Sequence, residues 1–343
     1  MSSSQVFDTI TVQRDASTIL DEARELVEPA HRVAVDEMPA EIRHVAGSHP
    51  PWWDADGRPA GRSGKAVRPA LALACSRAAG GGPDEGAVRA AVAVELVHDF
   101  SLLHDDVMDR DLTRRHRPAA WAVFGIGQAI LVGDVLLTAA MQQVGTGTGV
   151  KVLAAAVQDL CAGQSADLAF ERRGEVTLAQ CLAMAEGKTG ALLGAACELG
   201  ALAAGAGPDT AGLYRRFGRQ LGVAFQLVDD LLGVWGDPEA TGKPAGSDLS
   251  SRKKSLPVVA ALTSGMRAGE DLACRYGRDE QWDEAALTHV ANLVEAAGGR
   301  AWAQAEADRR IEAALSALAQ ARPDPAAAAD LHTLAALIVR RDH

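Results

Sequence analysis

Residues 103–116 read LHDDVMDRDLTRRH and place Asp105, Asp106 and Asp109 within five positions, with Arg114 and Arg115 soon after them. The first of these residues, 103–109, end an apolar-striped segment that begins at residue 84. This segment predicts a long helix with Asp84 as its N-cap. Carboxylates three and four residues apart on that helix share one face and repel each other, and the helix dipole disfavours anions at this end. A hard divalent cation such as Mg²⁺ removes that cost, although so short a motif alone is more often a solvated helix end. The candidate site residues of this stretch are Asp105, Asp106, Asp109, Arg114 and Arg115.

A second acidic pair makes metal binding the better interpretation. Residues 225–237, FQLVDDLLGVWGD, place Asp229 and Asp230 on an otherwise apolar helix, where two carboxylates are costly to desolvate unless they are neutralised. Gln226 lies three and four residues before them and shares their side. Gly233 stands where a third carboxylate would complete a DDxxD motif, so the sequence leaves open whether this cluster binds metal at full affinity.

Basic residues gather in four segments: GKAVRP, TRRH, EGKTGAL and TGKPAGSDLSSRKKSLP. Each alone is most often solvated charge. Beside two acidic clusters of metal-binding type, they indicate a strongly anionic ligand, a diphosphate. Arginine offers phosphate a bidentate fork, and lysine offers it a point charge. The basic residues are Lys65, Arg68, Arg114, Arg115, Lys188, Lys243, Arg252, Lys253 and Lys254.

The composition narrows the class of protein. The 343 residues are 48% hydrophobic, enough for a sizeable core. The formal net charge of -11 argues against binding to nucleic acid or anionic membranes. The five scattered cysteines form no CxxC pair, which favours reduced, buried thiols in a cytoplasmic protein. We see no secretory signal and no apolar run of about 20 residues, so stable membrane insertion is not expected.

The remaining segments read as helix after helix, and no alternating strand of convincing length appears. We therefore predict one all-α domain over residues 17–343, preceded by a flexible segment at 1–16. A loop rich in Pro, Gly and Asp covers residues 47–64, and we expect Trp52 and Trp53 to anchor it on the core. Further helices are expected at residues 17–38, 66–80, 119–144, 150–172, 178–204, 209–234, 256–264, 284–297, 301–321 and 326–340.

In combination and order, the motifs resemble those of the trans-isoprenyl diphosphate synthases, the polyprenyl synthetase family. The resemblance is strongest from Gly64 to Pro257, through GKAVRP, ELVHDFSLLHDDVMD, RR, GKTGAL, FQLVDD and TGKPAGSDL…KKSLP. It implies an all-α, isoprenoid-synthase-like bundle around a deep central cavity, usually as a homodimer. It also implies Mg²⁺-dependent, head-to-tail condensation of isopentenyl diphosphate onto an allylic diphosphate.

Carried over motif by motif, the resemblance implies a set of site residues. The implied metal ligands are Asp105, Asp106, Asp109, Asp229 and Asp230. The implied contacts of the allylic diphosphate are Arg114, Lys188 and Lys243, and the last basic contact is Lys253 or its neighbour Lys254. The implied isopentenyl diphosphate site comprises Lys65, Arg68, His98 and Arg115. Thr189 and Gln226 are implied to face the reacting carbons. Where the family often has GGKRLRP and RRG, this chain has Ser63, Ala66 and His116, and no charged ligand is lost.

The implied activity is that of a polyprenyl diphosphate synthase working by ionisation, condensation and elimination. Phe100 and Ser101 precede Asp105 by five and four residues. We expect them to line the floor of the product shaft, because one isoprene unit spans about one helical turn. A bulky residue there favours a short product, geranylgeranyl diphosphate, with farnesyl diphosphate as the alternative.

Three other functions are compatible with parts of the sequence. A class I terpene cyclase also ionises prenyl diphosphates, but Lys65, Arg68 and His98 would then have no role. A non-catalytic regulatory subunit of a synthase is supported only by Gly233. A general binder of divalent ions or phosphate would not explain the long apolar helices.

Overall fold

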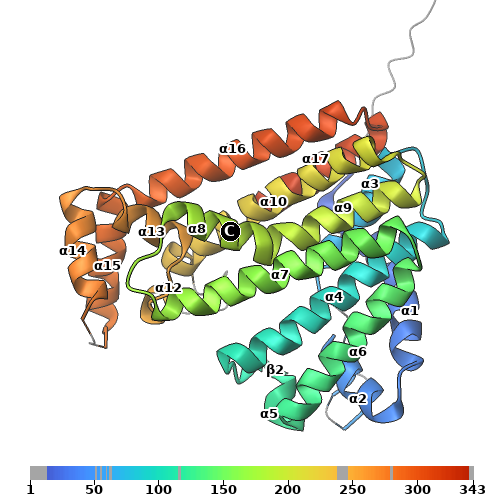
Figure 1. The fold of residues 1–343 in the computed structure, drawn as a ribbon, viewed down its shortest axis with the longest axis horizontal. Coiled ribbons are helices and arrows are strands. Elements are labelled where there is room, and N and C mark those ends of the chain that lie inside the picture. The colour runs from blue at the N-terminus through green and yellow to red at the C-terminus, as the bar shows by residue number, and fades with distance from the viewer. Residues whose placement is uncertain are drawn as a thin grey trace, which may run out of the picture.

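The protein is almost entirely helical in a computed structural model (Figure 1), which confirms the predicted all-α class. The structure describes residues 14–50, 52–54, 56–58, 60–61, 64–114, 117–237, 246–278 and 281–339. In chain order its elements are α1 (Ala16–Asp36), α2 (Ala40–Ser48), α3 (Val67–Ala78), α4 (Glu85–Asp109), β1 (Thr113–Arg114), β2 (Arg117–Pro118), α5 (Ala120–Phe124), α6 (Ile126–Val144), α7 (Thr148–Arg172), α8 (Leu178–Ala185), the π-helical turn η1 (Glu186–Gly190), α9 (Ala191–Ala203), α10 (Pro208–Trp235), α12 (Ser247–Ser250), α13 (Leu256–Leu262), α14 (Arg267–Tyr276), α15 (Glu284–Ala296), α16 (Gly299–Gln320) and α17 (Pro325–Val339).

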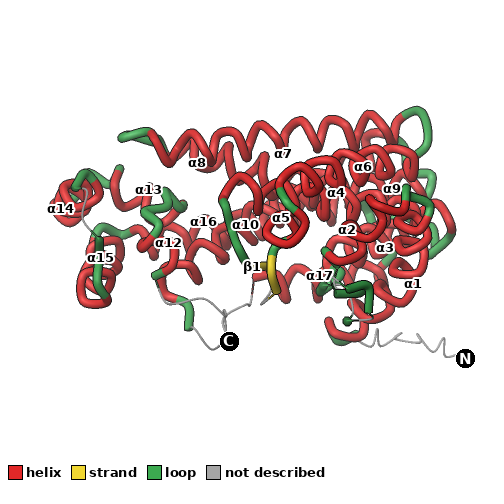
Figure 2. The backbone as a smooth tube through the Cα atoms, turned by 90° about the horizontal axis from the view of Figure 1, so that it is seen from below, coloured by secondary structure: helices red, strands yellow, loops and turns green. Residues whose placement is uncertain are grey.

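The long helices stack side by side. Helix α10 packs between α9 and α16, α4 packs on α6, and α3 packs on α9. In Figure 1, α16 runs along the upper edge, α13 to α15 gather at the left end, and α1 to α3 lie at the right. Figure 2 shows the short strand β1 near the middle of the molecule, between these two ends. Its pairing with β2 is antiparallel.

Small residues let the central helices approach closely. The main hydrophobic core includes fully buried alanines, valines and leucines of α3, α4 and α9. A Cβ atom added at Gly200 on α9 would lie 2.0 Å from the carbonyl oxygen of Ala72 on α3, so these two backbones are in direct contact. Alanine and glycine are abundant in these helices. Their small side chains let the helices pack closely, which gives a dense core.

Most predicted helices are confirmed, and Asp84 caps α4 by accepting a 2.9 Å hydrogen bond from the Ala87 amide. The predicted helix 119–144 is wrong in one respect, because Gly125 takes φ 89° and separates α5 from α6. The predicted helix 178–204 is likewise interrupted by η1. Helices α2, α12 and α14 were not predicted. Only Gly269 and Leu272 are buried in α14, which leaves too short an apolar pattern to reveal a helix.

The tryptophan prediction is confirmed. Trp52 is buried and meets His31 of α1 edge-on, with ring centroids 4.9 Å apart. The Trp53 indole N–H donates to the His44 carbonyl oxygen at 2.8 Å. Both rings therefore fix this loop on α1 and α2.

The cysteine prediction is correct in part. All five thiols are free, and Cys75, Cys181 and Cys197 are buried. Cys161 and Cys274 are exposed instead, on outward-facing positions of α7 and α14.

The predicted N-terminal segment lies mostly outside the described residues, which begin at Arg14. Helix α1 starts at Ala16, where the Asp15 carboxylate accepts a 3.2 Å hydrogen bond from the Ser17 amide. Among the residues that the structure describes, no helix combines the length and apolar character that crossing a lipid bilayer requires.

Candidate active site

The first acidic cluster lies at the C-terminal end of α4, where Arg114 folds back onto it. Arg110 takes the left-handed conformation (φ 58°) that ends the helix, and the β1–β2 pair then reverses the chain. The Arg114 guanidinium donates to Asp106 Oδ1 at 2.5 Å and lies 3.8 Å from Asp105 Oδ2. The Asp106 side chain is only 1% exposed, so the arginine neutralises a carboxylate that water barely reaches.

Lys188 lies beside this cluster on η1. Its Nζ is 2.7 Å from Asp167 Oδ2 and 3.5 Å from Asp105 Oδ1. The lysine therefore bridges α4 and α7. Asp167 was not predicted as a site residue, although it stands in an apolar stretch of α7 three residues after Gln164, a spacing that puts two polar side chains on one helix face.

The π-helical turn that carries Lys188 depends on glycine. A Cβ at Gly163 of α7 would lie 2.3 Å from the Lys188 backbone nitrogen, and one at Gly187 would lie 2.7 Å from the Asp159 carbonyl oxygen. The two backbones thus meet without side chains between them. Such π turns occur frequently at functional sites.

The electrostatics of this region favour binding of a cation. Although the Asp109 side chain is exposed, partial desolvation by its neighbours, together with the charge of Asp105, raises its pKa to about 6. Burial also raises the pKa of Asp106, against the opposing effect of Arg114. Burial alone would lower the pKa of Lys188, but Asp105 and Asp167 outweigh it and raise that pKa. Carboxylates with raised pKa values are incompletely neutralised, and a further cation would stabilise their charged forms.

The second cluster is organised around Asp230 on α10, which is 2% exposed. Its Oδ2 accepts a 2.9 Å hydrogen bond from the Leu256 amide, and its Oδ1 accepts one of 2.9 Å from Gln226. Gln226 in turn accepts a 2.7 Å hydrogen bond from the Thr189 hydroxyl. Burial raises the pKa of Asp230 to about 6 despite these donors. Asp229 is exposed at the surface of the same helix turn.

The two adjacent lysines after α12 point to different partners. Arg252 adopts a left-handed conformation (φ 54°), which reverses the chain between α12 and α13. Lys253 Nζ then lies 3.8 Å from Asp230 Oδ1. Lys254 Nζ instead donates to the carbonyl oxygens of Phe170, at 2.7 Å, and Arg173 at the end of α7. Lys253 is therefore the one of the two that faces the acidic cluster.

Both clusters contribute to a single charged region. The charge of Asp167 raises the pKa of both Lys188 and Lys253, although the two lysines belong to different clusters. The hydrogen bond from Thr189 to Gln226 also joins η1 to α10. The first and second acidic clusters are therefore joined through η1 and lie close enough for their charges to interact.

The remaining predicted residues belong to the isopentenyl diphosphate site, to the product floor or to segments outside the described residues. Lys65 is exposed just before α3, and Arg68 in the first turn of α3 is half-buried. His98 is half-buried on α4, which packs against α3. Ser101 is half-buried, whereas Phe100 is buried and meets the His104 ring edge-on at 4.8 Å. The predicted residues Arg115 and Lys243 lie outside the described residues, as does His116.

The donor set suits magnesium. The buried Asp106 Oδ2 atom has no hydrogen-bond partner among the described residues, and carboxylate oxygens are the ligands this ion prefers. Within the described part of the chain, no three acidic, histidine or cysteine side chains stand close enough to hold an ion by themselves. In proteins generally, Mg²⁺ is bound through one or two carboxylates and completes its shell with phosphate oxygens and water.

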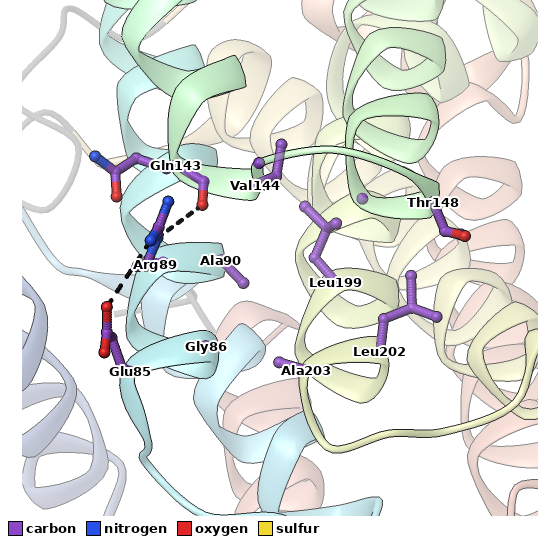
Figure 3. A pocket seen from close by; sticks show the side chains of 12 residues that line it. Glu85, Gly86, Arg89, Ala90, Gln143, Val144, Thr148, Leu199, Leu202 and Ala203 are labelled. Carbon is purple, nitrogen blue, oxygen red and sulfur yellow. Dashed lines mark hydrogen bonds and ion pairs between the residues drawn. The ribbon is translucent and has the colours of Figure 1, made fainter.

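A pocket of about 640 Å³ opens at the other end of α4. Figure 3 shows Leu199 and Leu202 of α9 and Ala90 of α4 on its walls, with Arg89 at its edge. Arg89 donates to the Gln143 carbonyl oxygen at 3.0 Å. From Asp105 to Ala90 the helix rises by about 22 Å, so this pocket is separate from the charged region.

The described residues thus combine an all-α bundle with two aspartate clusters, on α4 and α10, and with basic side chains that lie near them. The chain belongs to the polyprenyl synthetase family, whose model matches residues 59–294. It is 44% identical to a (2E,6E)-farnesyl diphosphate synthase of Mycobacterium tuberculosis, over 97% of this chain and 96% of that one. It is also 45% identical to a geranylgeranyl diphosphate synthase of the same species, over 94% and 93% of the two chains. The crystal structure of a polyprenyl synthetase from Streptomyces coelicolor A3(2), 44% identical, superposes with a TM-score of 0.91 over 95% of this chain and 100% of that one.

Proposed function

We propose that this protein is a prenyltransferase that condenses isopentenyl diphosphate head-to-tail with an allylic diphosphate. The observation that carries the proposal is the charged region itself. Arg114 pairs with Asp106, and Lys188 pairs with Asp105 and Asp167. The carboxylates and the cations neutralise each other in part, and a metal-complexed diphosphate offers each of them a further partner of opposite charge.

Each residue of the region receives a role. The metal ligands are Asp105, Asp106, Asp109, Asp229 and Asp230, with Mg²⁺ as the metal. The residues for the allylic diphosphate are Arg114, Lys188, Lys243 and Lys253. The residues for isopentenyl diphosphate are Lys65, Arg68, His98 and Arg115. The choice of Lys253 over Lys254 is supported by its distance of 3.8 Å from Asp230.

When bound, Mg²⁺ would act as a Lewis acid on the leaving diphosphate and as a template for it. Arg114 and Lys188 bind the oxygens on which negative charge develops as the allylic carbon–oxygen bond breaks. The Thr189 hydroxyl donates a hydrogen bond to Gln226. The lone pairs of the Thr189 hydroxyl oxygen are then free to stabilise the allylic cation. Apolar walls keep water from the cation, and the proton lost at the end passes to the departing diphosphate.

The product we favour is geranylgeranyl diphosphate, with farnesyl diphosphate as the alternative. The two mycobacterial relatives carry both names at nearly equal identity, 44% and 45%, so identity does not separate them. Phe100 supports a short product, because it is only 6% exposed and lies five residues before Asp105.

We further propose that residues 17–343 act as one synthase domain and that two copies associate through α5 and α6. These helices carry four large apolar side chains that are 41–54% exposed, an unusual density for a free surface. The residues are Val123, Ile126, Ile130 and Leu131.

A single assay tests the proposal. The full chain is incubated with radiolabelled isopentenyl diphosphate and dimethylallyl, geranyl or farnesyl diphosphate, with and without Mg²⁺. Labelled prenyl diphosphates that appear only with Mg²⁺, and disappear in Asp105→Asn, are expected. Cyclic hydrocarbon made from the allylic substrate alone would indicate a terpene cyclase. No product with any primer from a folded protein would indicate a non-catalytic subunit and overturn the proposal.

A further inference from the structure

Gly233 on α10 faces the carboxylate of Asp248 directly. A Cβ atom at Gly233 would lie 2.5 Å from both Cγ and Oδ2 of Asp248 and 2.8 Å from its Oδ1. Position 233 follows Asp229 by four residues and Asp230 by three, so it shares their helix face. The Asp248 carboxylate therefore occupies the space that a side chain at position 233 would fill.

The local fold holds Asp248 in this place. The short helix α12 begins after Gly246, which has φ 72°, and its buried Leu249 packs in one hydrophobic cluster with Val234 of α10. The Asp248 carbonyl oxygen accepts a 2.8 Å hydrogen bond from the Lys253 amide. These contacts fix the backbone of α12 against the last turns of α10.

Lys253 connects Asp248 to the second acidic cluster. Its Nζ lies 3.9 Å from Asp248 Oδ2 and 3.8 Å from Asp230 Oδ1. One ammonium group thus lies within 4 Å of both carboxylates. A metal ion that bound both carboxylates would compete with Lys253 for them.

We propose that Asp248 supplies a carboxylate ligand to the second metal cluster, in place of the side chain that is missing at Gly233, so that the ion is held by Asp230 and Asp248 and completes its shell with phosphate oxygens and water. This inference rests on the proposed function and adds a ligand to its metal site. Glycine is unfavourable inside a helix, and here it provides the room for a carboxylate that arrives from α12. The absence of a third aspartate from the sequence motif then does not remove a ligand from the cluster.

Binding of Mg²⁺ to the full chain in the presence of inorganic pyrophosphate tests the proposal by isothermal titration calorimetry. Asp248→Asn keeps the shape of the side chain and removes its charge, and we expect it to weaken Mg²⁺ binding by about 10-fold. Gly233→Ala leaves every ligand in place but pushes the Asp248 carboxylate aside, and a similar loss is expected. Asp134→Asn, which removes an exposed carboxylate of α6, is the matched control and should bind like the wild type.

Two double variants separate a ligand from a structural contact. In Gly233→Ala/Asp248→Asn the loss should equal that of Asp248→Asn alone, because both changes remove the same ligand. In Gly233→Asp/Asp248→Ala the carboxylate returns from α10, and we expect Mg²⁺ affinity to recover to within about threefold of the wild type. Thermal melting without ligands shows whether each variant is folded.

The outcomes divide clearly. Wild-type affinity in a folded Asp248→Asn, while Asp105→Asn loses Mg²⁺ binding, would overturn the role of Asp248 and leave the proposed function intact. A wild-type protein that binds no Mg²⁺ with pyrophosphate would overturn both. A folded Gly233→Asp/Asp248→Ala variant that binds no better than Asp248→Asn would also contradict the exchange of carboxylates.

Discussion

Replacing Phe100 by alanine should lengthen the product. Phe100 is 6% exposed and lies one and a half turns below Asp105 on α4, about 7.5 Å along the helix axis. If its ring forms the floor of the shaft, its removal opens the space down to the next residues on that face. These are Leu96 and Val97, about one turn or 5.4 Å deeper.

The expected gain is therefore one isoprene unit, which extends about 5 Å, close to one helical turn. The main product should become five carbons longer than that of the wild type, whichever that product is. Further growth is limited because Leu96 is fully buried in the core. Loss of a buried phenylalanine also costs about 3–5 kcal/mol of folding free energy, so Phe100→Leu, which removes less volume, serves as the milder variant.

Thin-layer chromatography of the prenyl alcohols, after dephosphorylation, measures the chain length. Phe170→Ala is a matched control, since Phe170 is 5% exposed but belongs to a different hydrophobic cluster, beside α8. That variant should lose stability without changing product length. Wild-type products from a folded, active Phe100→Ala enzyme would refute the assignment of the floor.

Three further changes test the supports of the site. Gly163→Ala should displace the π turn, lower the free energy of unfolding by about 1–3 kcal/mol and lower kcat/KM by about 100-fold. The control Gly212→Ala adds a Cβ that meets nothing within 4 Å, and it should not change kcat/KM. Gln226→Leu removes a donor to Asp230, and kcat should fall by about tenfold; an unchanged kcat would exclude a positioning role. Leu131→Glu places a charge on a side chain that is 54% exposed, and size-exclusion chromatography should show a monomer if α6 forms the dimer contact.

The sequence predicted the residues at the end of α4 because their relationship is local. The spacing of Asp105, Asp106 and Asp109 on one helix follows from helical periodicity, and Asp84 caps α4 as expected. Asp167 could not be found in this way. Its contact with Lys188, 21 residues later, exists only because the backbones of α7 and η1 touch.

The choice between Lys253 and Lys254 shows a similar limit. Both are lysines in one loop, and composition treats them alike. The left-handed conformation of Arg252 turns one toward Asp230 and leaves the other to bind the end of α7. Non-glycine residues seldom adopt that conformation, so no sequence pattern predicted the turn.

The ion pairs of the site explain why metal and diphosphate should bind together. Metal alone would compete with Lys188 and Lys253 for Asp105 and Asp230, and Lys188 would keep only Asp167 as its partner. Diphosphate alone would draw the same lysines away from the half-buried Asp105 and the buried Asp230, and a buried charge without a partner is costly. When metal and diphosphate bind together, the metal takes over the carboxylates and the diphosphate takes over the lysines. The binding of each therefore favours the binding of the other.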